Sequence, residues 1–199
     1  MLAIPQKRRP KLFIVGTICA VLIFGAGAYV LLLTASPSLG TFTVMRPINV
    51  SSLPLPNKTD NRIVIPKIGV DIAYAPGAAA LDRGAEWRYP DRGNPQTGGN
   101  FIIAAHRLSI QPTPLGTIEK SPFYNIDKLL VGDKIIIDYQ GQRYAYEINT
   151  IFNVTPNQTE IEAPSSTPKL TLYSCQLDGS SAGRVVINAK PLGQVAVNQ

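Results

Sequence analysis

The sequence predicts an all-β domain, a barrel or a sandwich with short helices, preceded by one N-terminal transmembrane helix. Seven runs of β-branched and aromatic residues, each bounded by Gly, Pro, Asn or Asp, indicate strands. Helical signals among them are few and short, and many short strands with few helices are typical of barrels and sandwiches. The N-terminal apolar run is far longer than any of these strands and is typical of a membrane span.

The transmembrane helix is predicted at residues 12–34, after a basic cytoplasmic tail at residues 1–11. As a helix, the uncharged run from 12 to 33 would be about 33 Å long, enough for a bilayer core of about 30 Å. Positive charge precedes the run and the next charge after it is Arg46, so the positive-inside rule places the N-terminus in the cytoplasm and the rest outside. The alternative is a cleaved signal peptide, although the run exceeds the usual apolar region of about 7 to 15 residues. The basic residues of the tail are Lys7, Arg8, Arg9 and Lys11.

Beyond the helix, residues 35–60 are predicted to form a Pro-rich extracellular linker, because their Pro, Ser, Thr and Asn resist packing into a core. The domain follows at residues 61–193, a normal size for one hydrophobic core, and residues 194–199 form a short tail. The formal net charge is +6, but four basic residues belong to the cytoplasmic tail, so the exported part is close to neutral. It has no basic stripe with interleaved aromatics, which argues against a nucleic-acid partner.

Within the domain, the hairpin and the helices have recognisable local signals. The sequence Tyr139-Gln140-Gly141-Gln142 is typical of a tight turn between two long strands. Short helical segments are predicted at residues 78–83 and 122–130, where Ser121 can cap the second helix and Pro122 suits its first turn. The strand runs are residues 62–66, 70–74, 100–105, 133–139, 142–154, 169–174 and 184–189.

Three side chains suited to acyl transfer stand at the ends of strand runs. Cys175 follows residues 169–174, His106 is the only histidine and follows residues 100–105, and Arg184 opens the last run. A thiol, an imidazole and a guanidinium are the nucleophile, the acid/base and the oxyanion stabiliser of thiol acyl transfer. One Cys and one His supply only half of a structural zinc shell. An exported thiol without a partner favours a reactive role, because oxidising compartments favour paired cysteines.

Less active roles explain some of these residues equally well. Cys175 at a strand end can be a small buried apolar residue, and Cys19 lies in the middle of the predicted span as an apolar helix residue. Arg107 is a second cation beside His106. Strand alternation turns neighbouring residues to opposite sides, however, which favours Arg184 as the catalytic arginine.

With these motifs, the sequence resembles the sortases, the membrane-anchored cysteine transpeptidases of bacterial surfaces. Residues 171–175, Thr-Leu-Tyr-Ser-Cys, resemble the family's Thr-Leu-x-Thr-Cys signature, with Ser174 where Thr is usual. Ala-His-Arg at 105–107 resembles the histidine motif, and residues 123–135 are similar to the Phe, Leu and Gly-Asp pattern between the two sites. Arg184 falls where the family places its essential arginine. The resemblance covers residues 62–189.

The resemblance implies an eight-stranded sortase-type β-barrel and a cysteine transpeptidase. Cys175 would attack the carbonyl between Thr and Gly of a C-terminal sorting signal of the Leu-Pro-x-Thr-Gly type, while His106 protonates the departing amine. A second amine would then resolve the thioester, with His106 as base and Arg184 at the oxyanion. The implied partners are surface proteins with a sorting signal and an amine acceptor, either a peptidoglycan precursor or a pilin lysine.

Substrate contacts and cofactors are also implied. The loop at 153–168 sits where the family's recognition loop joins two strands. No cofactor is expected, and Glu160 and Glu162 would be the calcium ligands if the chain shared the calcium site of some sortases. The expected substrate-binding residues are Ala105, Ser174, Ile161, Ala163 and Pro164.

Two other functions use the same features. A membrane-tethered cysteine peptidase or hydrolase of another fold would employ the same Cys175 and His106, but would release a free acid instead of a ligated product. A non-catalytic surface β-domain would keep Cys175 as part of its core, and alkylation of the thiol would then be slow and without consequence.

Overall fold

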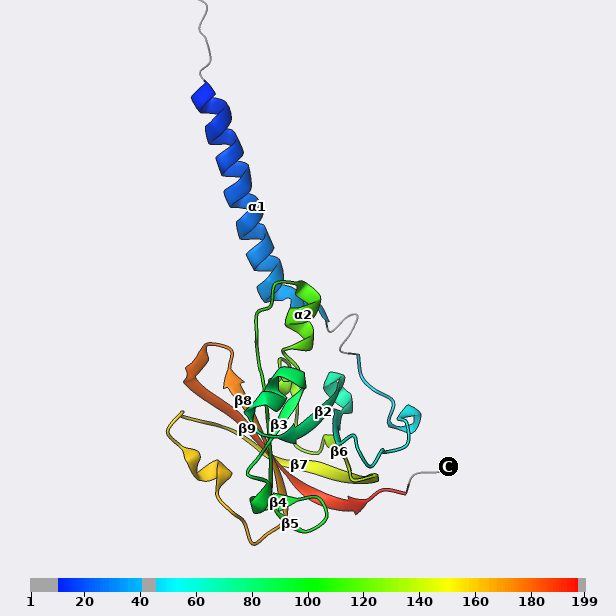
Figure 1. Cartoon of the computed structure of the whole chain (residues 1–199). Coiled ribbons are helices and arrows are strands. Elements are labelled where there is room, and N and C mark those ends of the chain that lie inside the picture. The colour runs from blue at the N-terminus through cyan, green and yellow to red at the C-terminus, as the bar shows by residue number, and fades with distance from the viewer. Residues whose placement is uncertain (1–10, 41–45, 197–199) are drawn as a thin grey trace, which may run out of the picture.

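The structure is a computed structural model that describes residues 11–40 and 46–196. A long helix, α1 (Lys11–Gly40), leads into a β-barrel that carries one further short helix, α2 (Pro114–Glu119), beside the end of α1 (Figure 1). The 3-10 helices are η1 (Val50–Ser52), η2 (Pro66–Ile68), η3 (Ala78–Arg83), η4 (Pro90–Arg92), η5 (Ile126–Lys128) and η6 (Thr159–Glu162). The strands are β1 (Arg62–Ile65), β2 (Val70–Pro76), β3 (Ala85–Arg88), β4 (Gly93–Asn94), β5 (Gly98–Ala105), β6 (Lys134–Tyr139), β7 (Gln142–Val154), β8 (Lys169–Gln176) and β9 (Gly179–Gln194).

The strands form a closed barrel. Their order is β3-β2-β1-β6-β7-β9-β8-β5-β4, and β3 also pairs with β5. That pairing closes a ring of eight strands and leaves the two-residue β4 beside β5. The structure therefore confirms the predicted eight-stranded barrel and excludes the sandwich.

The barrel interior is filled by alternate residues of each strand. Phe101 and Ile103 of β5, Leu170 and Leu172 of β8 and Ile187 of β9 all belong to the main core. The intervening residues of β5, β8 and β9, with Val154 at the end of β7, form a second, smaller cluster on the outer face, made of Ile102, Ala104, Val154, Tyr173 and Val186. Since both faces of β5 and β8 are covered, their sequences read as nearly continuous apolar runs.

The predicted hairpin between β6 and β7 is confirmed. Gln140 and Gly141 both have positive φ, 50° and 79°, as a two-residue type I′ turn requires. The strands β3 and β4 were not predicted, because they have only four and two residues, too few for the alternation in β3 to stand out as a strand run.

The helices differ from the prediction around residues 114–130. Only η5 forms within the expected helix at 122–130, while α2 forms earlier in the chain. Thr113 caps α2 by accepting a hydrogen bond from the Gly116 N–H, and Pro114 occupies its first turn. The segment at 78–83 is helical as predicted, in 3-10 geometry.

Helix α1 continues past the predicted boundary at residue 34. Pro37 lies inside it and cannot donate to the Leu33 carbonyl, which instead accepts from Ser36 Oγ at 2.8 Å. Residues 35–40, expected in the linker, are thus helical. By length and composition, Phe13–Gly40 is the one helix among the described residues that could cross a membrane. The tails at 1–10 and 197–199 and the linker residues 41–45 lie outside the described residues.

The rest of the predicted linker is attached to the barrel. The Ile48 N–H donates to the Pro66 carbonyl at 2.9 Å, and Arg143 donates to the Pro54 carbonyl at 2.7 Å. Residues 46–60 therefore lie against the domain rather than extending freely from it.

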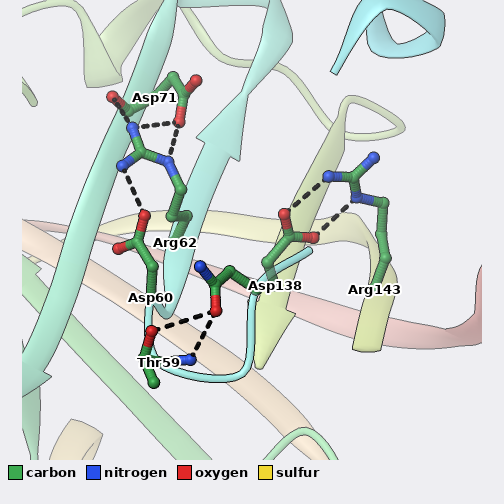
Figure 2. A network of polar contacts seen from close by, with 7 residues as sticks. Thr59, Asp60, Arg62, Asp71, Asp138 and Arg143 are labelled. Carbon is green, nitrogen blue, oxygen red and sulfur yellow. Dashed lines mark hydrogen bonds and ion pairs between the residues drawn. The ribbon is translucent and has the colours of Figure 1, made fainter. Parts of the chain in front are cut away.

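Ion pairs reinforce this side of the barrel (Figure 2). Asp138 of β6 and Arg143 of β7 are both buried and form two hydrogen bonds of 2.7 Å each. Arg62 of β1 contacts Asp71 of β2 at 2.7 Å and Asp60 at 3.3 Å. These pairs link the first two strands and the β6–β7 hairpin to the chain that enters the barrel.

Candidate active site

The strand register brings the three predicted catalytic residues to one end of neighbouring strands. β5 and β8 are parallel and pair Ala104 with Tyr173, and continuing this register by two residues places His106, the first residue after β5, opposite Cys175. In the antiparallel pair of β8 and β9, Cys175 is directly opposite Arg184. Directly opposed residues of such a pair have Cβ atoms about 4.5–5.5 Å apart. Cys175 therefore has the histidine strand on one side and the arginine strand on the other.

Alternation places these side chains on the outer face of the barrel. His106 and Cys175 each follow by two positions a member of the outer cluster, Ala104 and Tyr173, and Arg184 precedes Val186 by two. All three are half-buried, and Cys175 is a free thiol. The arrangement offers a nucleophile, a proton carrier and a cation to a molecule bound on this face.

Arg107 is turned to the other side. Its side chain is 5% exposed, Nε donates to the Tyr124 carbonyl at 2.9 Å, and Nη2 is 3.0 Å from Asp127 Oδ1. The His106 carbonyl also accepts from the Phe123 N–H at 3.1 Å. These bonds hold the segment after His106 against the chain around η5, and they occupy Arg107 away from Cys175.

A cleft opens beside Arg184, between the loop that follows β7 and the end of β3. Its volume is about 230 Å³, and Arg184 Nη1 donates to the Pro156 carbonyl on its rim at 3.1 Å. The Arg184 guanidinium carbon is 5.9 Å from the ring centroid of Tyr173. The lining residues are Arg88, Tyr89, Pro156, Gln158, Thr159, Ile161, Glu162 and Arg184.

The Sortase domain family model matches residues 63–192, which include nearly all of the barrel and the candidate site on it. The chain belongs to the sortase family. Sortase SrtE1 of Streptomyces coelicolor is 28% identical over an alignment of 145 residues that covers 63% of this chain and 38% of that protein. The chain thus spans well under half the length of this curated relative.

Solved sortase structures share the fold. A Clostridium perfringens sortase D5 transpeptidase is 32% identical, with a TM-score of 0.54, covering 67% of this chain and 79% of that one. Sortase E1 from Streptomyces coelicolor, solved with a tripeptide in its active site, is 23% identical, with a TM-score of 0.54 and coverage of 68% and 88%. The second comparison shows likeness of fold alone.

In this sortase, the loop after β7 is fixed to the outer face by Glu162. Its carboxylate accepts a hydrogen bond of 2.5 Å from the Tyr173 hydroxyl. The same carboxylate forms an ion pair with Arg88, with Oε1 3.0 Å from Nε, although the Nε–H of Arg88 is not aligned for a hydrogen bond. Arg92 donates to the Glu162 carbonyl at 2.5 Å. Burial raises the pKa of Tyr173, and the hydrogen bond to Glu162 raises it further, so Tyr173 stays neutral and is the donor.

The structure places only one of the predicted substrate-binding residues, Ile161, in the lining of the cleft. Ile161 lines the cleft and packs against the outer cluster, whereas Ala163 and Pro164 are exposed and outside the cleft lining. Ala105 and Ser174 are buried on the inner side, where Ser174 Oγ donates to the Ala105 carbonyl at 2.7 Å and ties β8 to β5.

The buried Asn100 also fixes the loop after β7. Its side-chain amide donates to the Ile161 carbonyl at 3.0 Å and to the Ala163 carbonyl at 2.8 Å. The loop backbone beside the cleft is therefore anchored to β5 as well as to Arg92.

Sequence reasoning missed Arg88 and Tyr89, because β3 is only four residues long and no local signal pairs it with the loop at 153–168. It also assigned Glu162 no structural partner. Within the described residues, no group of three or more His, Cys, Asp or Glu could hold a metal ion.

Proposed function

We propose that this sortase is a cysteine transpeptidase that cleaves a C-terminal sorting signal and joins the acyl product to an amine. The observation that carries the proposal is the position of Cys175 between His106 and Arg184 on adjacent strand ends of a sortase barrel. Each of these groups is partly exposed on the face that bears the cleft.

The first half of the reaction forms a thioester. The Cys175 sulfur, as a thiolate with its proton on His106, adds to the carbonyl carbon of the Thr–Gly bond of a Leu-Pro-x-Thr-Gly-like signal, and the negative charge on the oxygen faces Arg184. The C–N bond then breaks, His106 gives a proton to the departing Gly amine, and the acyl group remains on sulfur.

The second half transfers the acyl group. An acceptor amine attacks the thioester carbon, His106 takes the proton that the amine loses, and the Cys175 thiolate departs as the amide forms. We infer that the amine comes from a peptidoglycan precursor or a pilin lysine, in line with the family resemblance. All the groups required are side chains of this chain, so the proposed reaction uses no cofactor.

Recognition of the signal is assigned to the cleft beside Arg184. Ile161 offers an apolar wall, and Arg88, Tyr89 and Glu162 offer polar groups. A peptide lying over Tyr173 toward Cys175 would pass between these walls. Ala163 and Pro164 would contact only the part of a substrate that extends beyond the cleft lining.

Glu160 and Glu162 would be the calcium ligands only if the chain shared the calcium site of some sortases. The Glu162 carboxylate already contacts Arg88 and Tyr173, so a calcium ion there would have to compete with a cation and a hydroxyl donor.

We further propose that α1 is a single-pass anchor with a cytoplasmic N-terminus and an external catalytic domain. Its apolar length and the basic residues before it support this topology. Surface proteins that carry a sorting signal would then meet the enzyme at the membrane.

The test is product analysis with the full chain in detergent or vesicles. Sorting-signal peptides are incubated with glycyl, alanyl, diaminopimelyl and lysyl amines, and mass spectrometry separates amide from free acid. We expect amide from the parent and from Cys19→Ala, and none from Cys175→Ala. Free acid with every amine would instead identify a membrane-tethered hydrolase.

A further inference from the structure

The end of α1 and the region of α2 form one packed unit. The Tyr29 hydroxyl donates to the Pro112 carbonyl at 2.5 Å, and Ser38 Oγ lies 2.7 Å from the Tyr124 hydroxyl oxygen. One stripe of α1 is buried here, with the helical spacing of Leu33, Ser36, Pro37 and Gly40. Figure 1 shows α2 and the loop before it reaching up beside the last turns of α1.

Close approach at Gly40 makes this contact tight. A Cβ added at Gly40 would lie 3.3 Å from the Ile118 side chain, so the helix backbone itself packs on α2. With Pro37 and Ser36 also buried, α1 enters the domain without a flexible joint up to Gly40. The direction of α1 therefore fixes how the domain is oriented relative to whatever α1 crosses.

The helical rise sets the depth at which this contact occurs. Crossing a hydrocarbon core of about 30 Å takes roughly 20 residues, so a span that begins at Phe13 ends near Leu32. Tyr29 is in the last turn of that span, where tyrosines are enriched at the membrane–water boundary. Because Tyr29 is bonded to Pro112, the loop before α2 reaches the outer boundary of the same bilayer.

The loop before α2 and α2 itself have a composition suited to the membrane–water interface. No charged residue occurs between Arg107 and Glu119, and Ile110 and Leu115 are 53% and 55% exposed. Several polar backbone groups are satisfied within the segment: the Gln111 N–H donates to Thr117 Oγ1 at 2.9 Å and the Gly116 N–H to Thr113 Oγ1 at 3.1 Å. Transfer of such a segment from water into the membrane interface costs little free energy for the backbone groups that are already hydrogen-bonded.

We propose that residues 108–118, the interfacial segment, dock into the headgroup region of the bilayer that α1 crosses, with Ile110 and Leu115 as apolar contacts. The partner is the lipid bilayer, and the proposal rests on the proposed membrane anchor. Only Arg107 separates the segment from His106, and its bonds to Tyr124 and Asp127 fasten that junction. Docking would hold the candidate site at a set height and orientation above the membrane.

The test measures depth with an environment-sensitive fluorophore on the full chain in phosphatidylcholine–phosphatidylglycerol vesicles. The background is Cys19→Ser with Cys175→Ser, so that only an introduced thiol is labelled. Leu115→Cys carries the probe in the interfacial segment. The matched control is Leu192→Cys, also 50% exposed, in the last part of β9, which Figure 1 shows in red at the far end of the barrel from α1. Phe24→Cys, 80% exposed in the middle of α1, reports the span.

Lipids with a spin label near the headgroup should quench the Leu115 probe strongly. They should quench the Leu192 probe no more than they quench the same fluorophore free in water. Spin labels deep in the acyl chains should quench the Phe24 probe instead. If the Phe24 probe is quenched and the Leu115 probe behaves like the Leu192 probe, docking is wrong while the anchor stands. If the Phe24 probe is not quenched, the anchor is wrong and the docking proposal falls with it.

Discussion

The two arginines near the site should differ in what their loss does to stability and to turnover. Arg107 is 5% exposed and bonds the Tyr124 carbonyl, so Arg107→Met leaves that carbonyl without its donor. An unsatisfied buried acceptor costs about 1–3 kcal/mol. The Asp127 side chain is 56% exposed, so its ion pair adds at most about 1 kcal/mol. We expect the free energy of unfolding to fall by roughly 1–3 kcal/mol, with turnover of the folded enzyme nearly unchanged.

Arg184→Met should show the reverse. The side chain is half-buried and makes one hydrogen bond, to the Pro156 carbonyl, so the stability loss should be about 1 kcal/mol. In the proposed reaction, Arg184, the cation opposite Cys175, faces the developing oxyanion, and loss of such a donor should lower turnover by about 10² to 10³.

The assay compares kcat/KM for a sorting-signal peptide with urea unfolding in mild detergent, followed by fluorescence of the single tryptophan, Trp87, in the core. Activities are measured at a urea concentration and temperature where all three proteins are folded. An equal loss of turnover in Arg107→Met and Arg184→Met would refute the assignment, and a larger loss in Arg107→Met would reverse it.

Three further substitutions probe other parts of the account. Asp138→Ala leaves the buried Arg143 without its carboxylate partner and should lower the free energy of unfolding by about 3–5 kcal/mol. The double variant with Asp138→Leu and Arg143→Met should recover most of that loss. Leu115→Asp should leave turnover of a soluble peptide unchanged and reduce that of a vesicle-tethered peptide; equal effects on both would count against membrane docking. Glu162→Gln removes the charge that pairs with Arg88 and loosens a cleft wall, so KM should rise with little change in kcat, and a pure kcat loss would be inconsistent with this role.

The strand runs, and the positions of Cys175, His106 and Arg184 at their ends, were predictable from the sequence because both depend on local patterns. The apolar runs that became β5, β6, β7 and β8 are buried on one or both faces, which leaves an uninterrupted or alternating signal. Cys175, His106 and Arg184 stand at run ends, and the strand register then places them side by side.

The parts that were missed depend on contacts distant in sequence. β3 has only four residues, two of them charged, and becomes a strand because β2 and β5 flank it. α1 extends through Pro37 because Ser36 satisfies the Leu33 carbonyl and α2 packs alongside. The position of Glu162 against Tyr173 requires the folded barrel, since neither residue has a local signal for the other.

The proposed reaction requires that Cys175 form an acyl-enzyme that an amine resolves. Intact-protein mass spectrometry of the full chain, mixed with a sorting-signal peptide and quenched in acid at short times, tests it most directly. We expect an adduct with the mass of the peptide up to Thr, mapped to Cys175, absent in Cys175→Ala and discharged as amide when amine is added. Peptide turnover by Cys175→Ala at the parent rate, or an adduct on another residue, would show that Cys175 is not the nucleophile.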